Sequence, residues 1–397
     1  MKFFNSQPDK ERYFFATYEI EVNTGYDLKK ASWDLAIGQS VGNPNIRNKW
    51  ENDELFEQSS CIICHEEESL SGIIKGLVTI GFPVINTDWS HDSVTHLLCQ
   101  VMGGQVDIGT FKKCRLIKLD LPKKVEEFFA GPKYGINGFR KFTGIYHKPF
   151  SGAIVKPKTG ISPATLLQMV KELVDGGVDF IKEDEILSNP IFCKLEDRVE
   201  LISNYINNCG RKIVYCFCIN GDHDVIANRA NFVYQNGGNG IHLNIWSGLG
   251  GYKAIRNLDL PIFIHFQKSG DRVLTDPNNN FGIDWNVICD LAGLIGVDSI
   301  HAGMWGGYLN EDEKKLRATL DILKNRNVCP ALSCGMHPGL VNKNKQLFGS
   351  DFIANVGGAI HGHPDGTLSG AKAMRQAIDE SFGIEYKKAI DKWGLIT

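Results

Sequence analysis

The chain has 397 residues, a formal net charge of -3 and 43% hydrophobic residues, which is ordinary for a folded protein with more than one domain. This charge gives no basic surface for nucleic acid or anionic membrane, and we see neither a signal peptide nor an apolar run of the ~18 residues that a membrane helix needs. The 11 cysteines lack framework spacing, so we expect reduced thiols in a cytoplasmic protein.

The N-terminal third predicts a small α+β domain. Its expected elements are, in order, a strand over 12–21, a helix over 28–38, strands near 59–65 and 84–86, a helix over 91–101 and a strand over 114–119. Strand–helix–strand–strand–helix–strand is the ferredoxin-like order. We therefore expect a ferredoxin-like domain over residues 1–135.

From residue 150 onward, strands alternate with helices. The expected strands are 152–158, 179–185, 212–220, 240–245, 261–266, 299–303, 329–335 and 352–360. The expected helices are 163–177, 195–208, 223–236, 249–257, 284–296, 311–326 and 367–380. This alternation predicts a (β/α)8 TIM barrel over 136–397, which makes the chain an α/β protein with its chemistry at the carboxyl ends of the strands.

The most informative stretch is 179–185, Asp-Phe-Ile-Lys-Glu-Asp-Glu, at the end of the second barrel strand. Alternation places Lys182 and Asp184 on one face, and Glu185 comes round where the strand ends. Three crowded carboxylates repel one another unless a cation lies among them, and Mg²⁺ with oxygen ligands suits such a place. The lysine becomes a further oxygen ligand if its amine adds CO2 to form a carbamate. The alternative is a solvated acidic strand end.

The other strand ends favour the metal site. They carry Lys156 and Lys158, then Asn220, His242 and Asn244, His265, His301, Ser333 with Cys334 and Gly335, and finally Gly357 and Gly358. Singly, each has a plain explanation, for example a hydrogen-bonded core histidine or a turn cap. Together they predict an active site, and the exposed backbone N–H groups of the last glycines suit a phosphate.

Two of these strand ends also resemble a known family. Residues 152–162, Gly-Ala-Ile-Val-Lys-Pro-Lys-Thr-Gly-Ile-Ser, and the Lys-Glu-Asp-Glu run are similar to the KPKxGxS and KDDE motifs of the RuBisCO large subunit. The resemblance extends through the rest of the chain. It implies that Lys182, carbamylated by CO2, holds one Mg²⁺ per subunit together with Asp184 and Glu185. Lys156 would then move protons on the substrate carbon.

The resemblance implies further roles. Lys158 would favour proton loss from its neighbour by like-charge proximity, and His265 and His301 match the two active-site histidines. Substrate or phosphate binding is implied for Gln100, Asn220, Ser333, Gly335, Gly357 and Gly358. The loop over 38–44 corresponds to one that covers the active site of the neighbouring subunit, so we expect a homodimer with shared sites.

Three departures bear on the reaction. Phe266 stands where the carboxylases have an arginine that grips the second phosphate, and Tyr308 stands where they have the loop lysine that stabilises the attacking CO2. In the loop, Gly38, Asn43 and Pro44 replace a glutamate and a Thr-Trp pair. We also expect the short C-terminal tail to lack the closing latch. Carboxylation of ribulose bisphosphate is therefore not expected.

What remains is typical of a RuBisCO-like protein of the form IV type. We expect it to form a Mg²⁺-stabilised enolate from a monophosphorylated keto sugar or keto acid. Decarboxylation, or transcarboxylation and hydrolysis, of a substrate like 3-oxo-isoapionate 4-phosphate is favoured, because Gly-Gln-Ser-Val-Gly-Asn-Pro and Phe-Gln-Lys-Ser-Gly resemble that group. An enolase or isomerase of methylthio-ketose phosphates is the alternative, and a nonenzymatic regulatory relative is the second.

Overall fold

The computed structural model describes residues 4–43, 46–68 and 75–396. The chain divides into two compact units, one made of Met1–Phe129 with Gly270–Leu291 and the other of Ala130–Ser269 with Ala292–Thr397. The sequence analysis placed all of 270–291 in the barrel domain. In the structure, this segment instead contributes β10 (Phe281–Ile283) to the sheet of the first unit, where it pairs in parallel with β4.

The first unit is built on a five-stranded sheet in the order β10-β4-β1-β3-β2. Its other strands are β1 (Tyr13–Val22), β2 (Ile62–Glu68), β3 (Lys75–Pro83) and β4 (Phe111–Asp120). Its helices are α1 (Leu28–Gly38), α2 (Asp53–Ser59), α3 (Ser93–Val101), α4 (Lys123–Glu126) and α10 (Arg272–Thr275). The strand predicted near 84–86 is wrong, because β3 ends at Pro83 and Val84–Asn86 form a 3-10 turn.

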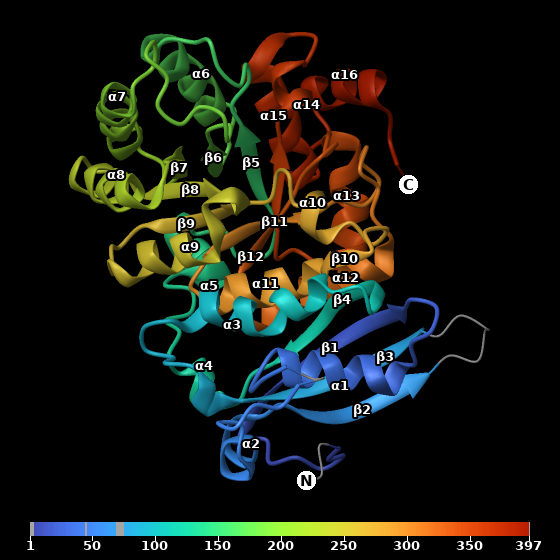
Figure 1. Cartoon of the computed structure of the whole chain (residues 1–397). Helices are drawn as coiled ribbons and strands as arrows, with labels where there is room; N and C mark the ends of the chain where they lie inside the picture. The colour runs from blue at the N-terminus through green and yellow to red at the C-terminus, as the bar shows by residue number, and fades with distance from the viewer. Residues whose placement is uncertain (1–3, 44–45, 69–74, 397) are drawn as a thin grey trace. The chain divides into compact units, whose positions relative to one another are not determined.

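The second unit is a closed barrel of eight parallel strands, which confirms the predicted fold class (Figure 1). The strands are β5 (Phe150–Ile154), β6 (Phe180–Lys182), β7 (Val214–Cys218), β8 (Gly240–Asn244), β9 (Phe263–Gln267), β11 (Ser299–Gly303), β12 (Cys329–Leu332) and β13 (Ile353–Val356). β11 has the predicted bounds, whereas β5, β6, β7, β8, β12 and β13 end before their predicted ends, because the polar residues that follow them leave the ladder. Those residues are free to form the site.

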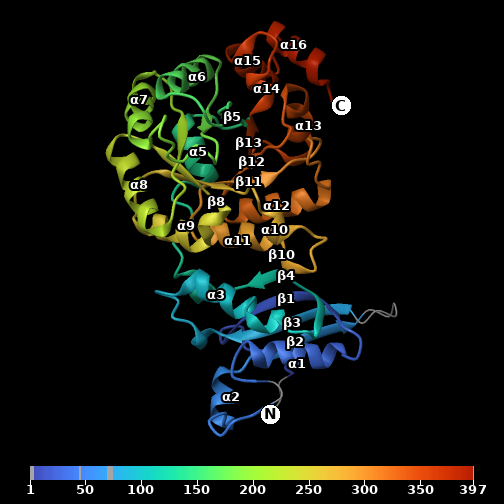
Figure 2. The same ribbon diagram turned by 45° about the horizontal axis from the view of Figure 1, so that its top comes forward.

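Helices surround the barrel strands, as Figure 2 shows from a second direction. They are α6 (Pro163–Asp175), α7 (Leu195–Asn208), α8 (His223–Gln235), α9 (Gly248–Asn257), α12 (Glu313–Asn325), α13 (Pro338–Phe348), α14 (Gly358–His361), α15 (Gly366–Asp379) and α16 (Ile384–Trp393), with α11 (Trp285–Leu294) running from one unit into the other. The sequence analysis missed α13, which Pro338 begins at its first turn.

One end of the barrel is closed by α5 (Gly135–Thr143). The ring of Phe139 lies 4.6 Å from Phe263, 5.7 Å from Phe150 and 6.0 Å from Phe180, measured between centroids. Since these three aromatic residues begin β9, β5 and β6, the apolar layer fills the N-terminal end of the barrel. Residues two places further along each strand, such as Lys182 and His265, therefore point into the barrel nearer its other end.

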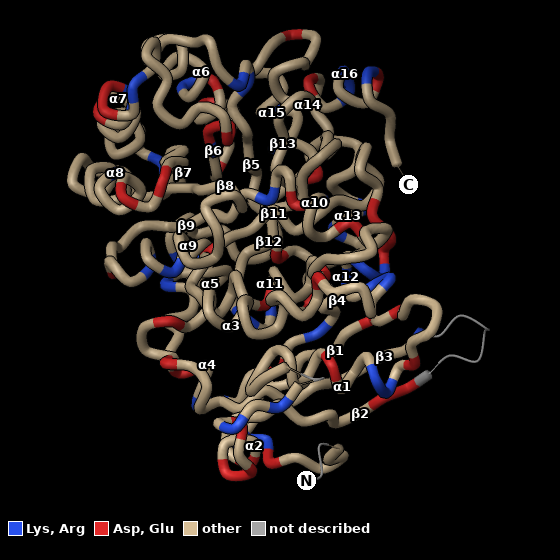
Figure 3. The backbone as a smooth tube through the Cα atoms, viewed as in Figure 1, with Lys and Arg blue, Asp and Glu red and all other residues tan. Residues whose placement is uncertain are grey.

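Lys and Arg residues and Asp and Glu residues both occur along the helices of the barrel unit (Figure 3). Within the described part of the chain, no helix is long and apolar enough to cross a membrane.

Candidate active site

A cavity of about 500 Å³ lies at the carboxyl ends of the barrel strands. The predicted site residues that line it are Lys156, Lys158, Asp184, Glu185, His301, Ser333, Gly335, Gly357 and Gly358. Closing the barrel therefore brings together strand ends that are far apart in the sequence. Lys182 and His265 lie in the barrel interior and are fully buried.

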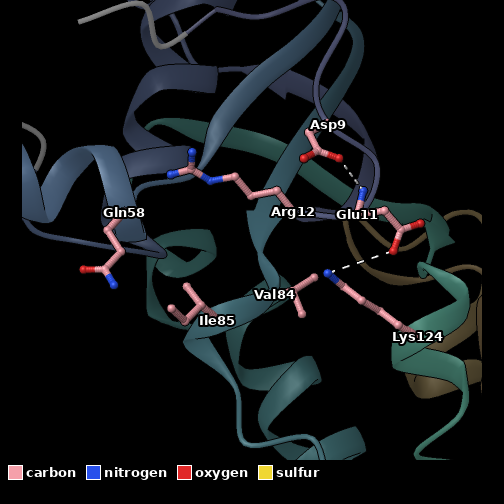
Figure 4. Close-up of a pocket in the computed structure, with 7 residues that line it drawn as sticks. All are labelled: Asp9, Glu11, Arg12, Gln58, Val84, Ile85 and Lys124. Atoms are coloured by element: carbon pink, nitrogen blue, oxygen red, sulfur yellow. Dashed lines mark hydrogen bonds and ion pairs between the residues drawn. The ribbon is translucent and has the colours of Figure 1, made fainter.

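A second cavity, of about 520 Å³, lies in the first unit (Figure 4). There, Asp9 accepts a hydrogen bond from the backbone N–H of Glu11, and Lys124 Nζ lies 4.0 Å from Glu11 Oε2. Among its described lining residues, none has a buried polar side-chain atom without a partner. The barrel cavity does have such atoms, on Gln267 and Asn355, so we take it as the candidate site.

Lys182 is the last residue of β6, and its side chain is 0% exposed. This corrects the expectation of a solvated position, because the residue points into the barrel and not out of its mouth. Its Nζ lies 3.7 Å from Glu185 Oε2 and makes no hydrogen bond to a described residue. Burial lowers the pKa of Lys182, against the opposing effect of the Glu185 and Asp184 carboxylates. A lowered pKa favours the neutral amine, which is the form that adds CO2.

The donor set can be tested against a divalent cation. No three His, Cys, Asp or Glu side chains group as a metal site in the described part of the chain. Asp184 and Glu185 supply two carboxylates at the cavity, so a third anionic oxygen must come from elsewhere. A carbamate on Lys182 would supply it, and the unpartnered amine fits this modification. With it, the residues fit Mg²⁺, which prefers oxygen ligands.

Lys156 pairs with one of these carboxylates. Its Nζ lies 2.5 Å from Asp184 Oδ2, and its side chain is 28% exposed whereas that of Asp184 is 2% exposed. Lys158 lines the same cavity. The pair holds the Lys156 amine at the cavity wall, and a cation bound to Asp184 would compete for the same carboxylate.

The glycines of the cavity have different surroundings. A Cβ on Gly357 would lie 3.2 Å from Lys156 Cε, so glycine at this position leaves room for the lysine. Gly335 has a φ of +113°. A Cβ on it would collide with Gly307 and with the backbone N of Tyr308, so only glycine fits here. A Cβ on Gly358 would meet nothing within 4 Å. Of the predicted phosphate-binding glycines, Gly358 therefore has the most open surroundings.

His265 and His301 are neighbours inside the barrel, with ring centroids 4.9 Å apart. His301 reaches the cavity, where its Nε2 lies 2.8 Å from Asn355 Nδ2 and its Nδ1 lies 3.4 Å from Ser333 Oγ. His265 contacts Ser299 Oγ through Nδ1 at 2.8 Å, whereas its buried Nε2 has no partner among the described residues. Burial holds the pKa of both rings well below the usual value, so both are neutral.

Several predicted residues lie elsewhere. Asn220 donates to the backbone carbonyl of Glu185 at 2.7 Å and accepts from the N–H of Asn244 at 2.7 Å, so it joins strand ends instead of lining the cavity. Gln100 lies in the first unit, where its Oε1 accepts from Thr87 Oγ1 at 2.9 Å. In the predicted covering loop, Pro44 lies outside the described residues.

Phe266 and Tyr308, which differ from the carboxylases, have different positions relative to the cavity. Phe266 is fully buried and stacks on Tyr252 with centroids 4.5 Å apart, so it points away from the cavity. We expected the Phe266 ring to face an uncharged part of the ligand, and this is wrong, since alternation along β9 turns the ring toward α9. Tyr308 lines the cavity and is 80% exposed.

Several residues of the cavity wall were not predicted from the sequence, and three of them are polar or aromatic residues that can contact a ligand, namely Gln267, Asn355 and Trp393. Gln267 and Asn355 follow His265 and Ile353 by two places, so strand alternation was a signal that could have identified them. Trp393, on α16, comes from the end of the chain, and no local pattern marks it. The C-terminal segment is thus part of this wall, although the sequence suggested a tail without a closing element.

The first carboxylate of the Lys-Glu-Asp-Glu run, Glu183, lies outside the site. Glu183 is fully buried and accepts hydrogen bonds from Arg198 Nε at 2.8 Å, Tyr215 OH at 3.2 Å and the Cys218 N–H at 2.8 Å. The expectation that three carboxylates crowd one cation is therefore wrong, because alternation turns Glu183 toward α7. The Glu183–Arg198 pair instead anchors the strand end that carries Asp184.

Removing one partner of this buried pair should destabilise the protein strongly. Arg198→Met leaves the Glu183 charge buried without its cation, and we expect a loss of about 3–5 kcal/mol in the free energy of unfolding. The matched control is Arg317→Met, which breaks a 2.9 Å pair with Glu313 on the surface of α12 and should cost less than about 1 kcal/mol. Urea titration measures both, and equal losses would contradict this role of Arg198.

The fold and the site now have counterparts among known proteins. The ribulose bisphosphate carboxylase large chain, catalytic domain, matches residues 135–328 and 319–391. The chain belongs to the RuBisCO large-chain family. Similar proteins include ribulose bisphosphate carboxylase of Pyrococcus furiosus, 31% identical over 96% of this chain and 94% of that protein. The 2,3-diketo-5-methylthiopentyl-1-phosphate enolase of Geobacillus kaustophilus is 27% identical over 96% and 98%.

Solved structures agree with this membership. The octameric ribulose-1,5-bisphosphate carboxylase/oxygenase of Pyrococcus horikoshii has a TM-score of 0.91 and 27% identity, over 100% of this chain and 97% of that one. A rubisco-like protein from Burkholderia fungorum has a TM-score of 0.84 and 25% identity, over 96% and 100%. The predicted relation to RuBisCO and RuBisCO-like proteins is confirmed.

Proposed function

We propose that the barrel cavity is the active site of a RuBisCO-like enzyme that forms an enolate from a monophosphorylated keto sugar or keto acid. The observation that carries this proposal is the grouping of a cavity lysine, its carboxylate partner and a buried, unpartnered lysine, namely Lys156, Asp184 and Lys182. A fold alone does not require such a group, which weighs against a nonenzymatic relative.

The proposed cofactors are one Mg²⁺ per subunit and CO2 as the carbamate of Lys182, with Asp184 and Glu185 as the other ligands. When bound, the cation supplies positive charge that stabilises the developing enolate oxygen. Gln267 donates to Glu185 Oε2 at 3.0 Å and so orients this ligand. The buried amine of Lys182 has no competing hydrogen-bond acceptor within the described residues.

Lys156 is proposed to move the proton. Its amine lies at the cavity wall beside Asp184, from which it can reach a carbon next to the substrate carbonyl. Lys158 adds a second cation to the same wall, and His301, whose two ring nitrogens contact Asn355 and Ser333, holds these two polar side chains at the cavity. The substrate phosphate is proposed to bind the backbone of Gly335, Gly357 and Gly358, and Ser333 is proposed to contact another part of the substrate.

The departures from the carboxylases support a single phosphate and no carboxylation. Phe266 is buried against Tyr252 and points away from the cavity, so it supplies no donor to a second phosphate there. A charge-assisted arginine–phosphate hydrogen bond contributes roughly 1.5–3 kcal/mol of binding, and Phe266 cannot make one. Tyr308 is a neutral phenol near pH 7, because tyrosine titrates near ~10. It cannot replace the cation that stabilises the attacking CO2.

For the reaction, we favour decarboxylation, or transcarboxylation and hydrolysis, of a substrate like 3-oxo-isoapionate 4-phosphate. The likeness of the Phe266–Gly270 stretch and of the 38–44 loop to that group supports it. The second candidate is an enolase or isomerase of methylthio-ketose phosphates, which the 27% identity to the Geobacillus enolase favours. We also propose a cytoplasmic homodimer in which Gln100 and the 38–44 loop serve the partner's site.

Matched ligands test the single phosphate. We expect 2-carboxyarabinitol 1,5-bisphosphate to bind no more tightly than one of its two monophosphates, because only one phosphate has a cradle. Isothermal calorimetry with Mg²⁺ and bicarbonate measures all three. Tighter binding of the bisphosphate by about tenfold, roughly 1.4 kcal/mol, would contradict the proposed function.

A further inference from the structure

Gln267, the last residue of β9, is a buried amide at the cavity wall. Its side chain is 3% exposed. Both hydrogens of the amide are engaged, because Nε2 donates to Glu185 Oε2 at 3.0 Å and to Ser269 Oγ at 2.6 Å. Its Oε1 is buried and accepts no hydrogen bond from any residue that the structure describes.

The orientation of the amide follows from its neighbour. An ionised carboxylate accepts hydrogen bonds but does not donate them, so the NH2 group of Gln267 must face Glu185. In the reverse orientation, the amide oxygen and the carboxylate would repel each other. The unpartnered atom is therefore the carbonyl oxygen, which is an acceptor only.

A second amide in the same cavity is arranged alike. Asn355 is 1% exposed, and its Nδ2 lies 2.8 Å from His301 Nε2. Its Oδ1 is also buried and without a partner in the described part of the chain. Buried carbonyl oxygens are rarely left unpaired, so a wall with two of them is suited to a ligand that donates hydrogen bonds.

We infer that Gln267 is a specificity-determining residue whose carbonyl oxygen accepts a hydrogen bond from a hydroxyl of the substrate's carbon chain. Its amide group meanwhile positions Glu185. The inference rests on the proposed function and narrows it to a phosphate with a free hydroxyl on its carbon chain. The 2,3-diketo-5-methylthiopentyl chain in the name of the Geobacillus enolase carries no such donor, whereas a methylthio-ketose does. Asn355 supplies the second acceptor of this wall.

The probes that test this are 4-phospho-D-erythronate and its 2-deoxy and 3-deoxy analogues, with binding measured by calorimetry in Mg²⁺ and bicarbonate. The wild type should prefer the fully hydroxylated probe over one deoxy analogue by about tenfold or more. Gln267→Met keeps the side-chain volume but removes the acceptor. Its dissociation constants for the three probes should therefore lie within about threefold of one another. A role confined to positioning Glu185 would weaken all three equally and keep the preference.

One variant serves as a control. Ser269→Ala removes the other contact of the amide without touching Oε1, and should keep the preference. A preference retained by Gln267→Met, or three equal affinities in the wild type, would overturn this inference alone. A wild type that binds none of the phosphates would overturn the proposed function together with it.

Discussion

Replacing Lys182 by methionine is expected to reduce turnover by at least about 10²–10³-fold, since it removes the anionic ligand that the carbamate would provide. The fold should survive. Methionine fills most of the volume, and the amine it replaces is buried without a hydrogen-bond partner, so its loss costs no hydrogen bond and only the 3.7 Å ion pair with Glu185. Thermal unfolding should show a melting temperature equal to or above that of the wild type.

The same experiment separates a carbamate from a plain structural lysine. Preincubation with bicarbonate and Mg²⁺ should raise wild-type turnover and leave Lys182→Met unchanged. The matched control is Lys324→Met on the exposed face of α12, which should respond as the wild type does. A Lys182→Met protein with near-normal turnover, or one still stimulated by bicarbonate, would contradict the assignment.

Replacing Lys156 by methionine is expected to slow solvent exchange at the carbon next to the substrate carbonyl by about 10²–10⁴-fold, which is the usual contribution of a general acid–base group. Lys156→Arg separates the two properties of the lysine, its positive charge and its ability to lose a proton. Arginine keeps the positive charge and can keep the pair with Asp184, but it does not give up its proton in proteins. Both variants should therefore lose exchange, although only methionine loses the charge.

Deuterium incorporation in D2O, followed by NMR, measures this exchange. Both variants should still bind the monophosphate and Mg²⁺, which calorimetry checks. Near-normal exchange in Lys156→Arg would mean that the proton travels through another group, and His301 would be the next candidate because it lines the same cavity.

Much of the site was predictable because a parallel barrel converts strand ends into neighbours. Lys156, Asp184 and His301 follow three different strands, and the fold rule alone places such residues around one cavity. The burial of Lys182 was not predicted. Its side chain follows the inward alternation of Phe180, so it lies below the mouth of the barrel, whereas Glu183 turns outward to a partner in a later helix.

What the sequence did not show depends on long-range contacts. Arg198 pairs with Glu183 from a helix whose own pattern gives no sign of it. The β10 strand joins the first unit from between two barrel strands, and its three residues are too few for a periodic signal. Trp393 reaches the cavity only because α16 packs on α15 and α13, a tertiary event without a local pattern.

The central claim is that this chain forms an enolate from a monophosphate and is not a carboxylase of ribulose bisphosphate. The most direct test is NMR of the wild type in D2O with Mg²⁺ and bicarbonate, given 3-oxo-isoapionate 4-phosphate in one sample and ribulose 1,5-bisphosphate in another. We predict that the monophosphate is consumed, with deuterium at the carbon next to the carbonyl of its product, and that the bisphosphate is unchanged. Carboxylation of the bisphosphate with the monophosphate left intact would contradict the account.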